Sequence, residues 1–303
     1  MNLKNKNLSI TIPVFNGVKT IKKTLDAIVN NKNVDIVISD NCSDDGTKEI
    51  LKAYATNFSN VKINFNPVNI GFDNNLMKCV ELCTTKYVWL LTDDDLIKDN
   101  AVAIVDKIIE DSNVEYGLIY VDNLFEYSGI KKSISGSNPN EFFEYSKFRS
   151  GGMSSNIINR TLWNNINFQI YPKDWPHVVY AIISLTNSNF YIYRESLKFE
   201  INPYEEKRWL KDLSLFRFLF TLKETFDIMK NFSIYSNKTI KSSKKVLEKH
   251  ISTAIIINKK KKIKFDLKTL IFIIKYSKKY IVINLILLIL PNRIYEFIKS
   301  IYK

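Results

Sequence analysis

Short apolar runs alternate with stretches of helical spacing along the first hundred residues. A continuous apolar run predicts a buried strand over 8–14, and further short, mainly apolar segments predict strands over 34–39, 61–65 and 87–91. Between them, apolar residues recur every three or four positions and predict helices over 18–28, 47–55 and 74–84. Strand and helix in alternation are typical of βαβ units, so the pattern predicts an α/β fold with a mainly parallel sheet.

Polar clusters follow three of these predicted strands, at 15–17, 40–46 and 92–95. Ligands of an open α/β sheet bind outside the carboxyl ends of its strands, so we expect the three loops to form one site. Asn, Asp and Gly are also ordinary turn and cap residues. This second interpretation is favoured for Asp44, Asp45 and Thr47.

The last of these clusters contains three adjacent carboxylates, Asp93, Asp94 and Asp95. Neighbouring carboxylates after a buried strand repel one another unless a cation neutralises them. Their oxygens suit Mg²⁺ or Mn²⁺, ions that keep several waters and are shared with substrate phosphates. The sequence has neither the GxxxxGK[ST] loop of P-loop proteins nor the GxGxxG of dinucleotide-binding proteins. A metal-assisted reaction of a diphosphate is therefore the chemistry that we expect.

Four segments together resemble family 2 glycosyltransferases of the GT-A fold. They are SITIPVFNG at 9–17, VISDNCSDDGT at 37–47, NIGFDNN at 69–75 and WLLTDDD at 89–95. NIGFDNN and LLTDDDL are most similar to bacterial transferases for O-antigen or capsule, including the abequosyltransferase-like group. The resemblance covers about the first hundred residues and implies a GT-A, Rossmann-like sheet flanked by helices.

The resemblance also implies a role for individual residues. Residues of four loops are implied to bind the donor nucleotide: Pro13, Phe15, Asn16, Asp40, Asn69, Gly71, Asn75, Asp93 and Asp94. The family's DxD motif falls on Asp93 and Asp95, which makes Asp95 the favoured metal ligand, with Asp93 nearer the ribose. Because three Asp are adjacent here, Asp94 remains a candidate. The family often has an Arg before the helix over 74–84, and this sequence has none between residues 61 and 95.

The resemblance implies that the second half of the catalytic region lies beside the acceptor. A strand is predicted over 117–121, a loop over 131–140, and an acceptor-side segment around Ser154. An inverting transfer needs a base, and the usual position of this base in the family points to Asp174. The alternative is that Asp174 caps a helix over 178–185.

Aromatic and acidic residues near this base have two interpretations each. Trp175 and His177 either face the acceptor or serve packing, and metal ligation by His177 is the less favoured option. Glu205, Glu206 and Trp209 either form a lid over the donor or begin an exposed helix.

The basic residues are concentrated in the last third of the chain. The whole sequence has a net charge of +13, whereas residues 1–200 carry 21 Lys and Arg against 23 Asp and Glu. We therefore predict a catalytic domain over 1–209 and a basic helical region over 210–303. The apolar run 281–290 is shorter than the roughly 20 residues of a membrane-spanning helix. Apolar faces beside Lys clusters favour association with an anionic membrane surface; an ordinary helical subdomain and an oligomer interface are the alternatives.

The function expected from these features is metal-dependent transfer of a sugar from a nucleotide sugar to an acceptor hydroxyl, with inversion implied by the family. The resemblance also implies a lipid-linked acceptor, at the inner face of the cytoplasmic membrane. A nucleotidyltransferase is the alternative enzyme, and a non-catalytic sugar- or lipid-binding protein is the alternative class. Nucleic acid is not an expected partner, since no nucleic-acid-binding motif accompanies the lysines. Neither a disulfide framework nor a signal peptide is expected from the three cysteines and the polar N-terminus.

Overall fold

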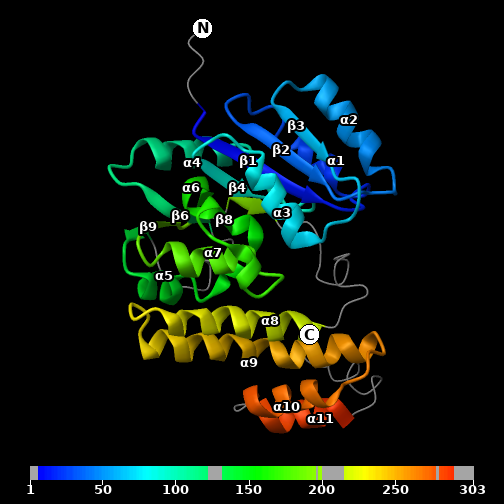
Figure 1. Ribbon diagram of the computed structural model, residues 1–303, viewed down its shortest axis with the longest axis vertical. Coiled ribbons are helices and arrows are strands. Elements are labelled where there is room, and N and C mark those ends of the chain that lie inside the picture. The colour runs from blue at the N-terminus through cyan, green and yellow to red at the C-terminus, as the bar shows by residue number, and fades with distance from the viewer. Residues whose placement is uncertain (1–5, 122–131, 196, 200–214, 278–279, 290–303) are drawn as a thin grey trace. The chain divides into compact units, whose positions relative to one another are not determined.

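The computed structural model describes residues 6–121, 132–195, 197–199, 215–277 and 280–289 (Figure 1). The chain divides into two compact units, Met1–Glu205 and Glu206–Lys303. The domain boundary expected at 209/210, and the lid residues Glu205, Glu206 and Trp209, lie outside the described residues.

The first unit is built on an eight-stranded sheet with the order β3-β2-β1-β4-β8-β6-β9-β7. Six strands run in the same direction, while β8 and β7 run against their neighbours. The strands are β1 (Leu8–Val14), β2 (Asp35–Asp40), β3 (Val61–Phe65), β4 (Tyr87–Leu90), β6 (Tyr116–Val121), β7 (Ile134–Gly136), β8 (Asn156–Asn159) and β9 (Asn189–Tyr193). A two-stranded ladder pairs β5 (Leu96–Ile97) with β10 (Lys198–Phe199). The prediction of a mainly parallel α/β sheet is confirmed.

Helices lie on both faces of this sheet (Figure 1). They are α1 (Ile21–Asp26), α2 (Thr47–Asn57), α3 (Phe72–Glu81), α4 (Ala101–Glu110), α5 (Pro139–Tyr145), α6 (Arg160–Asn164) and α7 (Pro176–Ser184). Alternate residues of β1, among them Leu8, Ile10 and Ile12, are fully buried in one core with residues of α1, α2 and α4. The intervening residues point to the opposite face, where α3 contacts β1 and β2. Burial on both faces explains why β1 is a continuous apolar run.

The second unit is helical. It contains α8 (Leu215–Asp227), α9 (Asn237–Lys260), α10 (Leu267–Tyr276) and α11 (Ile281–Ile289). Side-chain caps begin two of these helices, because Ser236 accepts from the N–H of Thr239 and Asp266 accepts from that of Thr269. Among the helices that the structure describes, none has the length and apolar character needed to cross a bilayer.

The middle of the chain differs most from the sequence-based expectation. The loop predicted over 131–140 is wrong for its described part, which contains β7 and the start of α5. Pro139 is the first residue of α5. An N–H group at this position would have no hydrogen-bond partner within the helix, so proline is tolerated there. The first-half strands match the prediction to within one residue at each end.

Candidate active site

The carboxyl ends of β1, β2 and β3 lie level with one another. Val14 pairs with Asp40, and Asp40 pairs with Phe65. The ladder between β1 and β4 ends three residues earlier along β1, where Thr11 pairs with Leu90. The two strands part after this pair, at the point where Pro13 has no N–H to donate. The loops that follow these strands therefore share one edge of the sheet, which we call the rim.

Asn16 connects the loop after β1 to the loop after β2. Its backbone φ is 53°, a left-handed conformation that Asn tolerates better than most residues. Its N–H donates to Ser43 Oγ at 2.8 Å, and its side-chain Oδ1 accepts from the N–H of Asp44 at 3.1 Å. The neighbouring Phe15 is 46% exposed and available to a ligand at the rim.

Gly17 allows the loop after β4 to approach the end of β1. A Cβ atom at Gly17 would lie 2.5 Å from Val14 Cγ2 and 2.8 Å from Asp93 Oδ2, both too close for a real side chain. Thr20 Oγ1 donates to the same Asp93 oxygen at 3.0 Å, and Thr24 Oγ1 donates to the Asp93 carbonyl at 2.9 Å. Asp93 is thus fixed against α1.

Asp45 and Thr47 lie at the turn that leads into α2, whose N-cap is Gly46 and has no side-chain cap bond. Asp45 accepts from the N–H groups of Thr47 and Val18, each at 3.1 Å. Burial raises the pKa of Asp45, but the hydrogen bonds from Thr47 and Val18 outweigh it and hold the pKa below its ordinary value. Thr47 Oγ1 in turn accepts from the Gly17 N–H at 2.7 Å. These two side chains hold the loops after β1 and β2 together.

Asp40 is fully buried at the end of β2. Its Oδ2 accepts from the N–H of Ser43 at 3.1 Å. Its Oδ1 has no hydrogen-bond partner among the residues that the structure describes. A buried acceptor without a donor destabilises a fold by about 1–3 kcal/mol, so this oxygen is a natural contact for a ligand N–H group.

A network of asparagine side chains holds the loop before α3. Asn75 is 2% exposed; its Nδ2 donates to the Ser39 carbonyl at 2.9 Å, and its Oδ1 accepts from Asn66 Nδ2 at 2.8 Å. Asn69 Oδ1 accepts from Asn41 Nδ2 at 2.8 Å and from the N–H of Gly71 at 2.9 Å. The side chains of Asn69 and Asn75 therefore shape the rim from within, while Gly71 is exposed on it with a φ of 82°.

The carboxylates of Asp93, Asp94 and Asp95 are half-buried at the same rim. Within the described part of the chain, no three Asp, Glu, His or Cys side chains gather closely enough to hold a metal ion by themselves. One reason is that Asp93 is turned toward Thr20. Two carboxylates at most would face one ion, and such a set fits an Mg²⁺ or Mn²⁺ whose remaining ligands are phosphate oxygens and water.

Asp174 lies beside the first turn of α3, although a hundred residues separate the two. Its N–H donates to Asp73 Oδ2 at 2.8 Å, and its backbone is left-handed with a φ of 74°. The alternative was that Asp174 caps the following helix, but the N-cap position of α7 is occupied by Trp175, whose side chain makes no cap bond. The carboxylate of Asp174 is half-buried at the rim.

Ser154 belongs to the turns over 149–155, and Trp175 and His177 contact Gly151 of the same turns. Ser154 is 1% exposed, and its Oγ accepts from the N–H of Thr92 at 3.0 Å. His177 is 3% exposed, and its Nε2 contacts the Gly151 carbonyl at 3.0 Å. Burial lowers the pKa of His177 to about 4, so the ring is neutral at pH 7. Ser154 and His177 are thus buried and hold the backbone at Thr92 and Gly151, whereas Trp175 is half-buried.

Several residues that shape the site were not singled out in the sequence as candidates. Asp73 fixes the backbone at Asp174, Thr20 orients Asp93, and Asn41 holds Asn69. Asp73 belongs to the segment NIGFDNN, which is the one signal that pointed to it. For Thr20 the sequence offers no signal, because its partner is 73 residues away.

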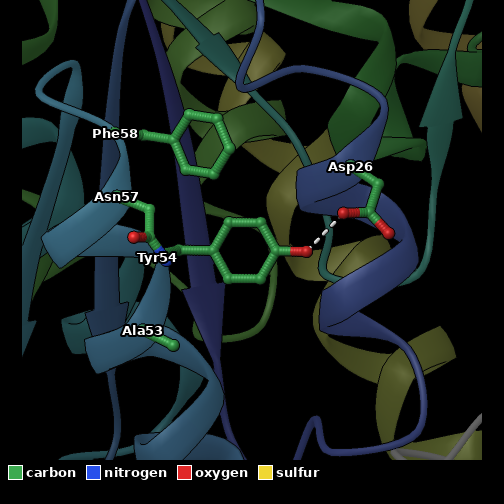
Figure 2. A pocket seen from close by; sticks show the side chains of 5 residues that line it. All are labelled: Asp26, Ala53, Tyr54, Asn57 and Phe58. Atoms are coloured by element: carbon green, nitrogen blue, oxygen red, sulfur yellow. Dashed lines mark hydrogen bonds between the residues drawn. The ribbon is translucent and has the colours of Figure 1, made fainter.

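A separate shallow pocket lies between α1 and α2 (Figure 2). Asp26, Ala53, Tyr54, Asn57 and Phe58 line it, and the Tyr54 hydroxyl donates to the Asp26 carboxylate. Because α2 begins at the rim with Thr47, these late residues of α2 lie toward the opposite edge of the sheet. The pocket is therefore distinct from the candidate site.

The fold and the sequence are similar to those of known glycosyltransferases. The abequosyltransferase RfbV of Salmonella typhimurium is 32% identical over 109 residues, which cover 34% of this chain and 32% of that protein. The GalNAc(5)-diNAcBac-PP-undecaprenol beta-1,3-glucosyltransferase of Campylobacter jejuni is 24% identical over 170 residues, 53% of this chain and 54% of that protein. The chain thus spans about a third to a half of the length of these curated relatives.

Solved structures share the fold at low sequence identity. TarS residues 1–349 from S. aureus give a TM-score of 0.64 at 14% identity, covering 90% of this chain and 82% of that one. The mannosyltransferase PcManGT of Pyrobaculum calidifontis, in complex with GDP-Man and Mn²⁺, gives 0.58 at 12% identity, covering 93% and 84%. These matches establish the GT-A fold.

A family model, Glycosyl transferase family 2, matches residues 9–166. The match contains the loops after β1, β2 and β4 and covers more than half of the chain. This chain belongs to glycosyl transferase family 2.

Proposed function

We propose that this protein transfers a sugar from a nucleoside-diphosphate sugar to a hydroxyl group of an acceptor, with inversion. The observation that carries the proposal is the convergence at one rim of Asp40, Asp93–Asp95 and Asp174, from segments that are distant in sequence. Membership of the family and its nucleotide-sugar-binding structural relatives support it.

The donor would lie along the ends of β1, β2 and β4. Asp40 offers its unpartnered Oδ1 to an N–H group of the nucleobase, which requires a small movement of the surrounding loop because this oxygen is buried. Phe15 is exposed beside it for apolar contact, and the backbone around Asn16 and Gly71 would border the ribose and diphosphate.

Asp95, together with Asp93 or Asp94, would hold Mg²⁺ or Mn²⁺. When bound, such an ion offsets the negative charge that develops on the departing diphosphate. Thr20 and Gly17 contribute by fixing Asp93 beside α1, which orders the loop that carries Asp94 and Asp95.

Asp174 would take the proton from the acceptor hydroxyl. Its left-handed backbone and the bond from its N–H to Asp73 hold it beside the loop that precedes α3. Strained backbone held by its surroundings is common at catalytic positions, which agrees with this role. Trp175 would border the acceptor on the same side.

The acceptor is proposed to be an oligosaccharide linked to a polyprenyl diphosphate, in bacterial surface-polysaccharide synthesis. This proposal rests on the abequosyltransferase and on the undecaprenol-linked substrate named for the Campylobacter relative. The enzyme would then work as a peripheral protein at the inner face of the cytoplasmic membrane.

Nucleotide binding by the purified full chain tests the proposal. Thermal unfolding is followed with UDP, GDP, CDP and dTDP, each with and without Mn²⁺. One nucleotide is expected to raise the midpoint, and to raise it more with Mn²⁺, because a ligand that binds only the folded state stabilises it. The corresponding nucleotide sugars then identify the donor by slow hydrolysis or by transfer.

Asp95→Asn and Asp99→Asn form a matched pair for this experiment. Asp99 lies four residues further on and is exposed to solvent. Asp95→Asn should remove the Mn²⁺-dependent part of the shift and the sugar transfer, while Asp99→Asn should keep both. Full transfer by Asp95→Asn, or no shift with any nucleotide, would refute the proposal.

A further inference from the structure

Helix α11 has its polar and apolar sides reversed relative to a helix on a water-facing surface. Its polar residue, Asn284, is completely buried. Val282, Ile286 and Ile289 are 66%, 48% and 84% exposed. A helix at a water-facing surface normally turns its apolar stripe inward and its polar residues outward. The reversal indicates that the outer side of α11 faces a medium other than water.

Hydrogen bonds fix this orientation of α11 within its unit. Asn284 Oδ1 accepts from Ser252 Oγ at 2.6 Å, and its Nδ2 donates to Ser277 Oγ at 2.9 Å. Lys259 Nζ donates to the carbonyl oxygens of Leu287 and Leu288, at 2.6 and 3.2 Å, and so satisfies the last turn of the helix. Rotating the apolar residues inward would break these bonds.

Helix α10 adds a second apolar stripe. Leu267, Ile271 and Ile274 follow one another at helical spacing and are 73%, 55% and 60% exposed. The opposite side of the same helix is buried through Phe272 and Ile273. Helices α10 and α11 contact each other within the unit. We define the α10–α11 apolar face as Leu267, Ile271, Ile274, Val282, Ile286 and Ile289.

Exposed lysines accompany this face. Lys262 and Lys264 precede α10, and Lys268 and Lys275 lie on it beside the apolar stripe. Residues 249–289 contain ten Lys and one carboxylate, Asp266, which caps α10. Apolar side chains next to unbalanced positive charge suit a surface that is apolar inside and anionic at its boundary.

We propose that the α10–α11 apolar face inserts into the interface of an anionic lipid bilayer, with Lys264, Lys268 and Lys275 at the level of the lipid phosphates. The lysine excess favours lipid over a second copy of the chain, whose identical lysines would repel. This inference names the surface by which the protein would reach the membrane of the proposed function. It rests on the proposed function only for the identity of that membrane.

Co-sedimentation of the full chain with vesicles tests this surface. The vesicles contain either phosphatidylcholine alone or phosphatidylcholine with phosphatidylglycerol, at low and high salt. Binding is expected to the anionic vesicles and to weaken with salt. Ile271→Glu with Ile286→Glu should lower the partition coefficient about tenfold or more, because two apolar anchors are lost. Ile234→Glu is the matched control, since Ile234 is 41% exposed in the same unit but outside the face.

Nucleotide-induced stabilisation is measured on the same variants, so that failure of this inference is distinguishable from failure of the proposed function. All variants should keep their unfolding midpoint and their response to nucleotide. Ile274→Gln, a milder change, should reduce vesicle binding less than the double variant. Unchanged vesicle binding by the double variant would overturn the proposal. The proposal would also be overturned if the wild-type protein did not bind vesicles and formed a dimer that the double variant converts to a monomer.

Discussion

At the scale of single residues, Asp174 combines an unusual backbone with a candidate catalytic role. Its φ of 74° is tolerated by Asp, Asn and Gly, and much less by residues with larger side chains. Its N–H is held by Asp73, so the main chain is fixed independently of the Asp174 carboxylate. The bond from the Asp174 N–H to Asp73 does not involve the Asp174 carboxylate, so a substitution of that side chain leaves this backbone bond in place.

Replacing Asp174 by Asn is expected to slow sugar transfer by about 100-fold or more, since the base that takes the acceptor proton is lost. Donor binding and the unfolding midpoint should stay close to those of the wild type. Steady-state transfer rates and the nucleotide-induced shift measure the two quantities. Asp73→Asn keeps an acceptor oxygen for the Asp174 N–H and serves as the comparison. Normal turnover in Asp174→Asn would place the base elsewhere.

At the scale of elements, the rim is a set of loops tied together by short polar side chains. Thr47 is the best example, because its Oγ1 accepts from Gly17 in the loop after β1 while Thr47 itself begins α2. Thr47 and Gly17 are both buried, so water would not replace the hydrogen bond between them if it were lost.

Thr47→Val should lower the free energy of unfolding by about 1–3 kcal/mol, because the Gly17 N–H would remain buried without an acceptor. Thr47→Ser keeps the hydroxyl and should remain close to wild type. Urea unfolding of the three proteins gives the comparison. Equal stability of Thr47→Val and Thr47→Ser would show that the bond contributes nothing.

The elements also show how far the sequence could predict this fold. Strand β1 was predicted over its full length, because a parallel strand buried on both faces is visible as a local apolar run. Strand β8 was not predicted, since it has only two apolar residues, Ile157 and Ile158, between asparagines. It inserts between β4 and β6, and such pairing between distant segments leaves no local pattern.

The site was predictable to a similar degree. The position of the rim and of its carboxylates was predictable, because clusters of polar residues come directly after the apolar runs that form the strands. The buried, structural environment of Asn75 and Ser154 was not predictable, because their hydrogen-bond partners Ser39 and Thr92 are 36 and 62 residues away.

At the scale of the whole molecule, stability should depend on pH through His177. Burial lowers the pKa of this ring to about 4, whereas an unfolded His titrates near 6.5. The unfolded state therefore binds a proton first as the pH falls. The contribution of the neutral His177 ring to the free energy of unfolding is fully present above about pH 6.5. It is lost progressively as the pH falls to about 4, and the total loss is on the order of 3 kcal/mol.

Urea unfolding at pH 7 and pH 5 should show this loss in the wild type. His177→Gln should flatten the dependence between these two values, because the titrating ring is gone. His250→Gln should keep it, since His250 is exposed. Lowered carboxylate pKa values such as that of Asp45 act at lower pH and do not mask the comparison. An unchanged slope in His177→Gln would contradict the assignment.

The turn at Asn16–Gly17 has a consequence for the chemical ageing of the protein. An asparagine followed by glycine deamidates when the glycine nitrogen attacks the asparagine side-chain carbonyl. Here the Gly17 N–H is held by Thr47, and the Asn16 side chain is held by the backbone of Asp44. Folding thus keeps the two reacting atoms from moving freely, and unfolding releases them. Each unfolding event exposes the chain to a permanent change, a new carboxylate at the edge where a diphosphate is proposed to bind. The working life of a molecule would then be set by how often it opens.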